Sequence, residues 1–160
     1  MLLALGANLG DPAAQIEAAL EGLAAHLQLG VVSSVYRTAP VGRLDQPDFL
    51  NLVVAGTTES TVYRLHGWIQ QIEGEMGRVR GEPNAPRLID IDLLAYGELV
   101  LSSADLVVPH PRLHERSFVL DPLVEIAPEW RHPLIGRSAR ELATSLRNPS
   151  RVERLGVLGR

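Results

Sequence analysis

Residues 87–94 read Arg-Leu-Ile-Asp-Ile-Asp-Leu-Leu and carry the clearest strand signal in the chain. Side chains alternate between the two faces of a strand, so Asp90 and Asp92 share one face and the apolar residues around them share the other. The apolar face predicts burial in a core. The two carboxylates, with Cβ atoms about 7 Å apart, repel each other. They fit either a solvated sheet face or a site for a pair of divalent cations, and their oxygen ligands favour Mg²⁺.

The periodicity on both sides of this strand predicts an α+β chain. Strands are expected at 2–7, 31–36, 49–58 and 88–96. Helices with an apolar stripe are expected after Asp11-Pro12 and over about residues 61–76. An irregular stretch and short helices at 117–126 and 138–147 form a tail. This β-α-β-β-α-β order suits a sandwich with helices on one face of an antiparallel sheet.

Composition excludes several classes of protein. The chain has 160 residues and no Cys, and its 15 basic residues are all Arg, against 19 acidic residues and a net charge of −4. The length predicts a single domain over 1–160. Without Cys or Lys there is no disulfide scaffold, thiolate nucleophile, Schiff-base lysine or Walker-A lysine. The acidic balance argues against nucleic-acid binding. The lack of a signal peptide or a long apolar run predicts a cytoplasmic protein with no membrane partner.

Arginine must therefore bind any phosphate. Arg78, Arg80 and Arg87 flank the polar loop just before the aspartate pair, and Arg116 lies downstream. Guanidinium groups donate two hydrogen bonds at once to phosphate oxygens and keep their charge at any working pH. Alone, the group also fits a solvated loop. Next to the aspartate pair, it indicates a triphosphate site.

The chain has two phenylalanines, Phe49 and Phe118, and each lies beside polar residues. Asn51 shares a strand face with Phe49, because the two are two positions apart. Two aromatic rings can hold a flat heterocycle between them. A carboxamide offers a donor and an acceptor to the amino-oxo edge of a guanine-like or pterin ring. The alternative is two core phenylalanines and an ordinary strand asparagine.

His110 and His114 have the i, i+4 spacing of a helical zinc site. However, Pro109 and Pro111 flank His110 and rule out a regular helix there. We therefore favour His110 as a hydrogen-bond donor to a phosphate or ribose over a zinc ligand.

Taken together, segments that match in order over nearly the whole chain resemble the 6-hydroxymethyl-7,8-dihydropterin pyrophosphokinase family. They are Tyr36-Arg-Thr-Ala-Pro40, Asp45-Gln-Pro-Asp-Phe-Leu-Asn51, Gly77-Arg-Val-Arg80, Pro86-Arg-Leu-Ile-Asp-Ile-Asp92, and Val108-Pro-His-Pro-Arg112 with Arg116-Ser-Phe-Val-Leu120. The resemblance implies a monomeric enzyme with a ferredoxin-like α+β fold. It also implies a reaction that moves the terminal diphosphate of ATP to the hydroxymethyl group of the dihydropterin and releases AMP, in folate biosynthesis.

The resemblance implies a role for each matching residue. Asp90 and Asp92 would hold two Mg²⁺ ions, and Arg78 and Arg87 would stabilise charge during transfer; these four are the expected catalytic residues. The residues expected to bind ATP are Gln70, Glu73, Arg78, Arg80, Arg87, Leu93, Val107, His110 and Arg116. Those expected to bind the pterin are Thr38, Ala39, Val41, Phe49, Asn51 and Phe118, with the two phenylalanines stacking on the ring. Segments 38–48 and 77–86 are expected to close over the substrates.

Two other functions stay open from the residues alone. A nucleotide-binding regulatory module would use the arginines without catalysis, and a two-metal phosphohydrolase would release phosphate without any pterin. A pterin site that Mg²⁺ and ATP create together distinguishes the pyrophosphokinase from both.

Overall fold

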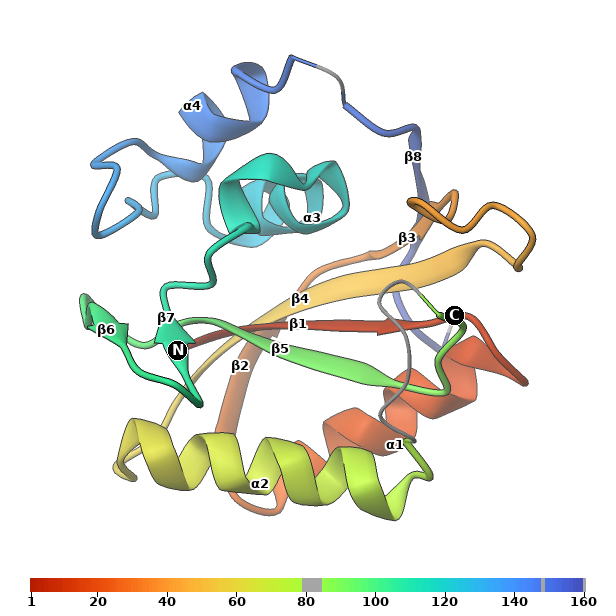
Figure 1. Cartoon of the computed structure of the whole chain (residues 1–160), viewed down its shortest axis with the longest axis horizontal. Helices are drawn as coiled ribbons and strands as arrows, with labels where there is room; N and C mark the ends of the chain where they lie inside the picture. The colour runs from red at the N-terminus through yellow and green to blue at the C-terminus, as the bar shows by residue number, and fades with distance from the viewer. Residues whose placement is uncertain (79–84, 148, 160) are drawn as a thin grey trace.

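The centre of the fold is β1 (Leu2–Ala7), which pairs antiparallel with β4 (Phe49–Thr57) on one side and with β5 (Asp90–Ala95) on the other. The computed structural model describes residues 1–78, 85–147 and 149–159. The remaining strands of the sheet lie beyond β4; they are β2 (Gln28–Val32), β3 (Val35–Thr38) and β8 (Val152–Gly156). The predicted α+β fold with an antiparallel sheet and packed helices is confirmed (Figure 1).

The strand register places the polar residues of three strands side by side. Gly6 of β1 lies opposite Asn51 of β4 and also opposite Asp90 of β5, while Ala4 lies opposite Asp92. Residues paired in this way point to the same face of a sheet. One end of one face is therefore polar, and the apolar residues between these positions point to the other face.

Two helices cover the apolar face (Figure 1). α1 (Pro12–Ala24) follows Asp11 and α2 (Val62–Glu75) follows Thr61, and each of these preceding side chains accepts a hydrogen bond from the first turn of its helix. Burial of each large apolar side chain between helices and sheet stabilises the fold by about 1.5–3 kcal/mol. The fully buried members of this core include Leu3, Leu5, Ile16, Leu23, Leu52 and Leu65.

The helices of the tail cover part of the other face. The sequence predicts helices on one face only, but α3 (Ser117–Ile126) and α4 (Ala139–Thr144) pack on the opposite face, against Leu2, Val53 and Leu94. These three residues form a second apolar patch, and a second layer is needed to bury it. The patch occupies the end of the central strands away from Gly6, so the polar end stays open.

Other segments also differ from expectation. The stretch expected to be one strand at 31–36 is divided between β2 and β3, because Ser33 pairs with Val53 through its main chain and its side chain (Ser33 N to Val53 O 2.9 Å, Val53 N to Ser33 Oγ 3.0 Å). The sequence does not predict β8, whose middle residues are exposed. The stretch expected to be irregular contains β7 (Val107–Val108), which pairs with β6 (Leu101–Ser102), and a 3₁₀ turn at Leu113–Glu115.

Glu125, near the end of α3, fastens that helix to the sheet. Its carboxylate accepts hydrogen bonds from Ser34 N at 3.2 Å, Ser34 Oγ at 2.8 Å, Tyr36 OH at 2.7 Å and Arg154 Nη2 at 3.1 Å. Burial alone would raise the pKa of Glu125, but these hydrogen bonds outweigh burial and hold the pKa below its ordinary value. Glu125 thus joins α3, β3 and β8.

Within the described ranges, none of the helices has both the length and the apolar character needed to cross a bilayer.

Candidate active site

A cleft lies on the part of the sheet that α3 and α4 leave open. Its floor comes from β1, β4 and β5, and its walls come from the end of β3 and the residues after it, the start of α3 and the residues just before β5. The lining residues are Ala4, Leu5, Gly6, Thr38, Ala39, Val41, Phe49, Asn51, Ala85, Arg87, Asp90, Asp92, Arg116 and Phe118. Segments far apart in the sequence meet here because β1 pairs with both of its neighbours.

The residues predicted to bind a pterin all line this cleft: Thr38, Ala39, Val41, Phe49, Asn51 and Phe118. Asn51 is only 7% exposed, and its Nδ2 donates to Thr38 Oγ1 at 2.8 Å. This bond ties the carboxamide to the end of β3. A Cβ on Gly6 would lie 2.6 Å from Asn51 Oδ1, so the carboxamide rests on bare backbone of β1.

The two phenylalanines enter the cleft from different elements. Phe49 is the first residue of β4, and Phe118 lies in the first turn of α3. The guanidinium carbon of Arg116 lies 5.5 Å from the centroid of the Phe118 ring. This cation–π contact orients both side chains in the lining of the cleft. The pair can therefore offer aromatic faces to a flat ring next to a fixed positive charge.

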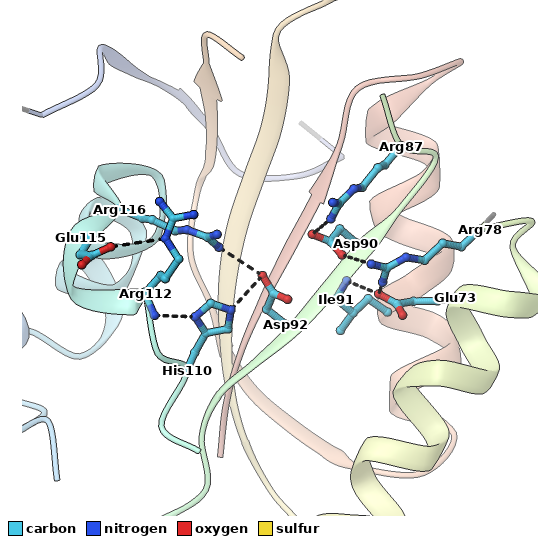
Figure 2. Close-up of polar contacts among 10 residues, drawn as sticks. All are labelled: Glu73, Arg78, Arg87, Asp90, Ile91, Asp92, His110, Arg112, Glu115 and Arg116. Carbon is cyan, nitrogen blue, oxygen red and sulfur yellow. Dashed lines mark hydrogen bonds and ion pairs between the residues drawn. The ribbon is translucent and has the colours of Figure 1, made fainter. Parts of the chain in front are cut away.

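Asp90 lies between two arginines (Figure 2). Arg87 Nη1 lies 2.6 Å from Asp90 Oδ2, and Arg78 Nη2 lies 3.0 Å from Asp90 Oδ1. Arg78 also donates to Glu73 Oε1, which accepts a hydrogen bond from Ile91 N at 2.7 Å. Glu73 is 6% exposed, and burial raises its pKa. The buried Glu73 carboxylate, which the main chain of Ile91 holds in place, thus keeps Arg78 at the edge of β5.

Asp92 has weaker compensation for its charge (Figure 2). The nearest cationic atom is Arg116 Nη1, 3.7 Å from Asp92 Oδ2, and His110 Nε2 lies at 3.8 Å. Burial and the charge of Asp90 raise the pKa of Asp92 to about 7. A half-buried carboxylate beside a second carboxylate fits a divalent cation, because the cation relieves both the burial cost and the repulsion. Asp90 and Asp92 are thus the residues that could hold a metal.

His110 is neutral at physiological pH. Burial, followed by the charge of Arg116, lowers the pKa of His110 to about 4. Its Nδ1 accepts a hydrogen bond from Arg112 N at 3.1 Å, so the proton of the neutral ring is on Nε2, which faces Asp92. The main-chain N of His110 donates to Leu94 O at 2.9 Å, which anchors the ring beside β5. The arrangement suits the hydrogen-bond donor that the sequence predicts.

The residues predicted to bind ATP fall into two groups, inside and outside the lining of the cleft. Arg87 and Arg116 line the cleft, whereas the other described members lie outside its lining: Gln70, Glu73, Arg78, Leu93, Val107 and His110. Gln70 is exposed on α2, Val107 is 40% exposed, and the Leu93 side chain is buried on the far face of the sheet. Any contact between Leu93 and ATP would therefore come from its main chain. Arg80 lies outside the described residues.

Sequence reasoning missed part of the cleft, namely Ala4, Leu5, Gly6 and Ala85. For Gly6 a signal exists, because a glycine inside an apolar strand often marks a close approach of another group. Ala4, Leu5 and Ala85 carry no such signal, since alanine and leucine occur throughout cores.

Comparison with known proteins gives a consistent result. A family model described as 7,8-dihydro-6-hydroxymethylpterin-pyrophosphokinase (HPPK) matches residues 2–128. The 2-amino-4-hydroxy-6-hydroxymethyldihydropteridine pyrophosphokinase of Methylorubrum extorquens is 46% identical over 155 residues, which is 96% of each chain. The protein of the same name from Bacillus subtilis is 43% identical over 126 residues, covering 78% of this chain and 75% of that one.

Solved structures resemble the fold at much lower identity. A crystal structure of a Plasmodium falciparum HPPK-DHPS with pterin and p-hydrobenzoate superposes with a TM-score of 0.70 at 18% identity, over 89% of this chain and 43% of that chain. An HPPK-DHPS in complex with substrates gives a TM-score of 0.71 at 15% identity, over 90% of this chain and 42% of that chain. The present chain spans less than half of either, and the likeness concerns the fold alone.

Proposed function

Because the chain belongs to the 7,8-dihydro-6-hydroxymethylpterin-pyrophosphokinase family, we propose that the cleft over β1, β4 and β5 is where it transfers the diphosphate of ATP to 6-hydroxymethyl-7,8-dihydropterin. The observation that carries this assignment is the shared lining. All the residues suited to a pterin line the same cleft as Arg87, Asp90, Asp92 and Arg116, which suit a triphosphate. Donor and acceptor substrates can thus meet in one place.

The pterin end of the cleft is argued from shape and hydrogen bonding. Phe49 and Phe118 would lie against the faces of the ring, with stacking of about 1–3 kcal/mol per aromatic face if nucleobases are a guide. Asn51, held by Thr38, would pair with the amino-oxo edge. Ala39 and Val41 complete the wall. The ring then points its hydroxymethyl group along the floor toward β5.

The phosphate end is argued from charge. Arg87 and Arg116 line the cleft, and Arg78 joins Arg87 at Asp90. We propose that Asp90 and Asp92 hold two Mg²⁺ ions. Among the described residues, no group of three or more His, Cys, Asp or Glu side chains could hold a metal. Phosphate oxygens and water would therefore complete each shell, as is usual for Mg²⁺. Bound Mg²⁺ supplies neutralisation of phosphate charge.

The reaction then needs positioning more than acid–base chemistry. The pterin hydroxyl oxygen bonds to the β-phosphorus, the bond from that phosphorus to the oxygen bridging toward the α-phosphorus breaks, and AMP leaves with that oxygen while the hydroxyl loses its proton to solvent. Arg87 and Arg78 donate to the transferred group, where charge builds in the transition state. His110 donates from Nε2 to a phosphate or ribose oxygen of ATP. The other predicted ATP residues outside the lining, Gln70, Glu73, Leu93 and Val107, would contact the part of ATP that extends beyond β5.

The test is release of AMP from ATP and Mg²⁺, with and without the dihydropterin. We expect AMP only when the pterin is present. Phosphate release without pterin would point to a phosphohydrolase, and tight ATP binding without turnover would point to a binding module.

The metal assignment is tested with Asp92→Asn, which keeps the shape of the side chain and removes its charge. We expect turnover to fall to background at saturating Mg²⁺. Direct titration with Mn²⁺, followed by electron paramagnetic resonance, should show weakened metal binding in the presence of an unreactive ATP analogue. Glu21→Gln, an exposed change on α1, is the control for loss of one surface charge. Near-normal turnover or metal affinity in Asp92→Asn would refute the assignment.

The single domain, the monomeric state and the cytoplasmic location stay predictions from the sequence. Light scattering coupled to size exclusion measures the oligomeric state directly.

A further inference from the structure

We propose that Asn8 is a positioning residue that holds Arg87 and the segment 39–48 in one fixed arrangement across the cleft. Asn8 follows β1 and does not itself line the cleft. The inference rests on the proposed function, because it assigns Arg87 to the phosphate end and the segment leading to Phe49 to the pterin end.

The first half of the arrangement joins Asn8 to Arg87. Asn8 Oδ1 accepts a hydrogen bond from Arg87 N at 2.9 Å, and Asn8 N donates to Arg87 O at 3.1 Å. Leu9 N also donates to Arg87 O, at 3.3 Å. These bonds fix the main chain of Arg87 just before β5, and its guanidinium then reaches Asp90 at 2.6 Å. The position of this cation therefore depends on the end of β1.

The second half joins Asn8 to the segment that precedes Phe49. Asn8 Nδ2 donates to Pro47 O at 3.0 Å and to Gln46 Oε1 at 2.9 Å. Gln46 Nε2 in turn donates to Arg43 O at 2.8 Å. The segment is thus tied to Asn8 close to the point where it enters β4, and Phe49 follows Pro47 by two residues.

The Asn8 carboxamide satisfies a donor on one side and an acceptor on the other. The partner on one side, Arg87 N, is a donor, and the partner Pro47 O on the other side can only accept, so position 8 must supply an oxygen and an N–H at once. The Asn8 side chain is 3% exposed, so water cannot easily replace a lost partner. Asn8 therefore links the pterin end and the phosphate end through one rigid group.

The experiment compares steady-state kinetics of the full chain with those of Asn8→Ala and Asn8→Asp. Asn8→Ala removes the side-chain hydrogen bonds to Arg87 and to the segment 39–48. We expect kcat to fall roughly 10- to 100-fold, the scale of a misplacement of about 1 Å. The KM for the pterin should also rise. Asn8→Asp keeps an oxygen for Arg87 N but turns an oxygen toward Pro47 O. It should raise the pterin KM while kcat falls less than in Asn8→Ala.

A purely structural role would lower the active fraction without changing the pterin KM. The same substitution made in the Arg87→Ala variant is a sharper test, because the guanidinium that Asn8 would position is then absent. There, Asn8→Ala should lower kcat by less than about threefold. An unchanged pterin KM, or kcat losses that multiply in the double variant, would overturn the proposal.

Should Asn8→Ala fail to fold by circular dichroism, Gln46→Ala carries the test. It removes the bond from Asn8 to the Gln46 side chain together with the bond from Gln46 to Arg43 O, and it leaves the bonds from Asn8 to Arg87, so we expect a raised pterin KM with kcat near that of the unchanged chain. An unaltered KM in Gln46→Ala would then overturn the proposal. Failure of the unchanged chain to release AMP with the pterin would instead refute the proposed function, so the two failures are distinguishable.

Discussion

The change Gly6→Ala adds one methyl group to the floor of the cleft. A Cβ at this position would lie 2.6 Å from Asn51 Oδ1, and real Cβ contacts are essentially never shorter than 3.0 Å. Gly6 is not among the glycines with positive φ, so the change introduces no backbone strain. The effect is therefore steric, and the Asn51 carboxamide must move away from β1.

The magnitude follows from what Asn51 loses. Moving the carboxamide breaks or lengthens the 2.8 Å bond from its Nδ2 to Thr38 Oγ1, and overpacking costs about 1–3 kcal/mol of unfolding free energy. At about 2–4 °C per kcal/mol for a domain of this size, the melting temperature should fall by roughly 2–12 °C. A pterin edge left unpaired by Asn51 costs about 1–3 kcal/mol of binding, or roughly 5- to 150-fold in Kd.

The assay is calorimetric titration of the dihydropterin into the protein with Mg²⁺ and an unreactive ATP analogue. Gly67→Ala in α2 is the matched control, because its Cβ would meet nothing within 4 Å. It should leave the Kd unchanged and raise stability slightly, as alanine favours a helix over glycine. If Gly6→Ala stays folded and binds the pterin within about twofold of the unchanged chain, Asn51 does not recognise the ring.

Two further predictions concern charge. Arg87→Ala should lower kcat by about 10³-fold or more while the Kd for ATP changes far less, because the guanidinium acts mainly on the transition state; equal losses in single-turnover rate and ATP binding would mark it as a simple binding residue. Glu125→Ala should cost about 2–5 kcal/mol in urea unfolding at pH 7, because buried donors of Ser34 and Tyr36 lose their acceptor. The folded-state pKa of Glu125 is lowered, so the stabilisation from its charge is complete above the unfolded pKa of about 4.3 and is lost as pH falls through the folded pKa. If the difference in unfolding free energy between the unchanged chain and Glu125→Ala is as large at about pH 3 as at pH 7, this reasoning is wrong.

How far the sequence predicts the site depends on how local each signal is. The alternation around Asp90 and Asp92 is local and correctly places both carboxylates on one face, in the cleft. The face of the sheet on which α3 packs has no local signal, because the apolar stripe of α3 fits either face. Its position depends on the apolar patch around Val53. The role of Asn8 has no local signal in periodicity or charge, since one amide after a strand becomes informative only when Arg87 and Pro47 are seen beside it.

Gly6 also lies between the two halves of the reaction, since Asn51 pairs with it from one side and Asp90 from the other. Neighbouring strands lie about 4.8 Å apart, so main-chain hydrogen bonds set a span of roughly 10 Å between these two residues. Substitutions in Leu2–Ala7 change side chains but leave this span intact. Deletion or insertion of one residue there would turn the rest of the strand over, and a residue other than Gly6 would then lie between Asn51 and Asp90. The length of this segment is therefore under tighter constraint than the identity of most of its residues.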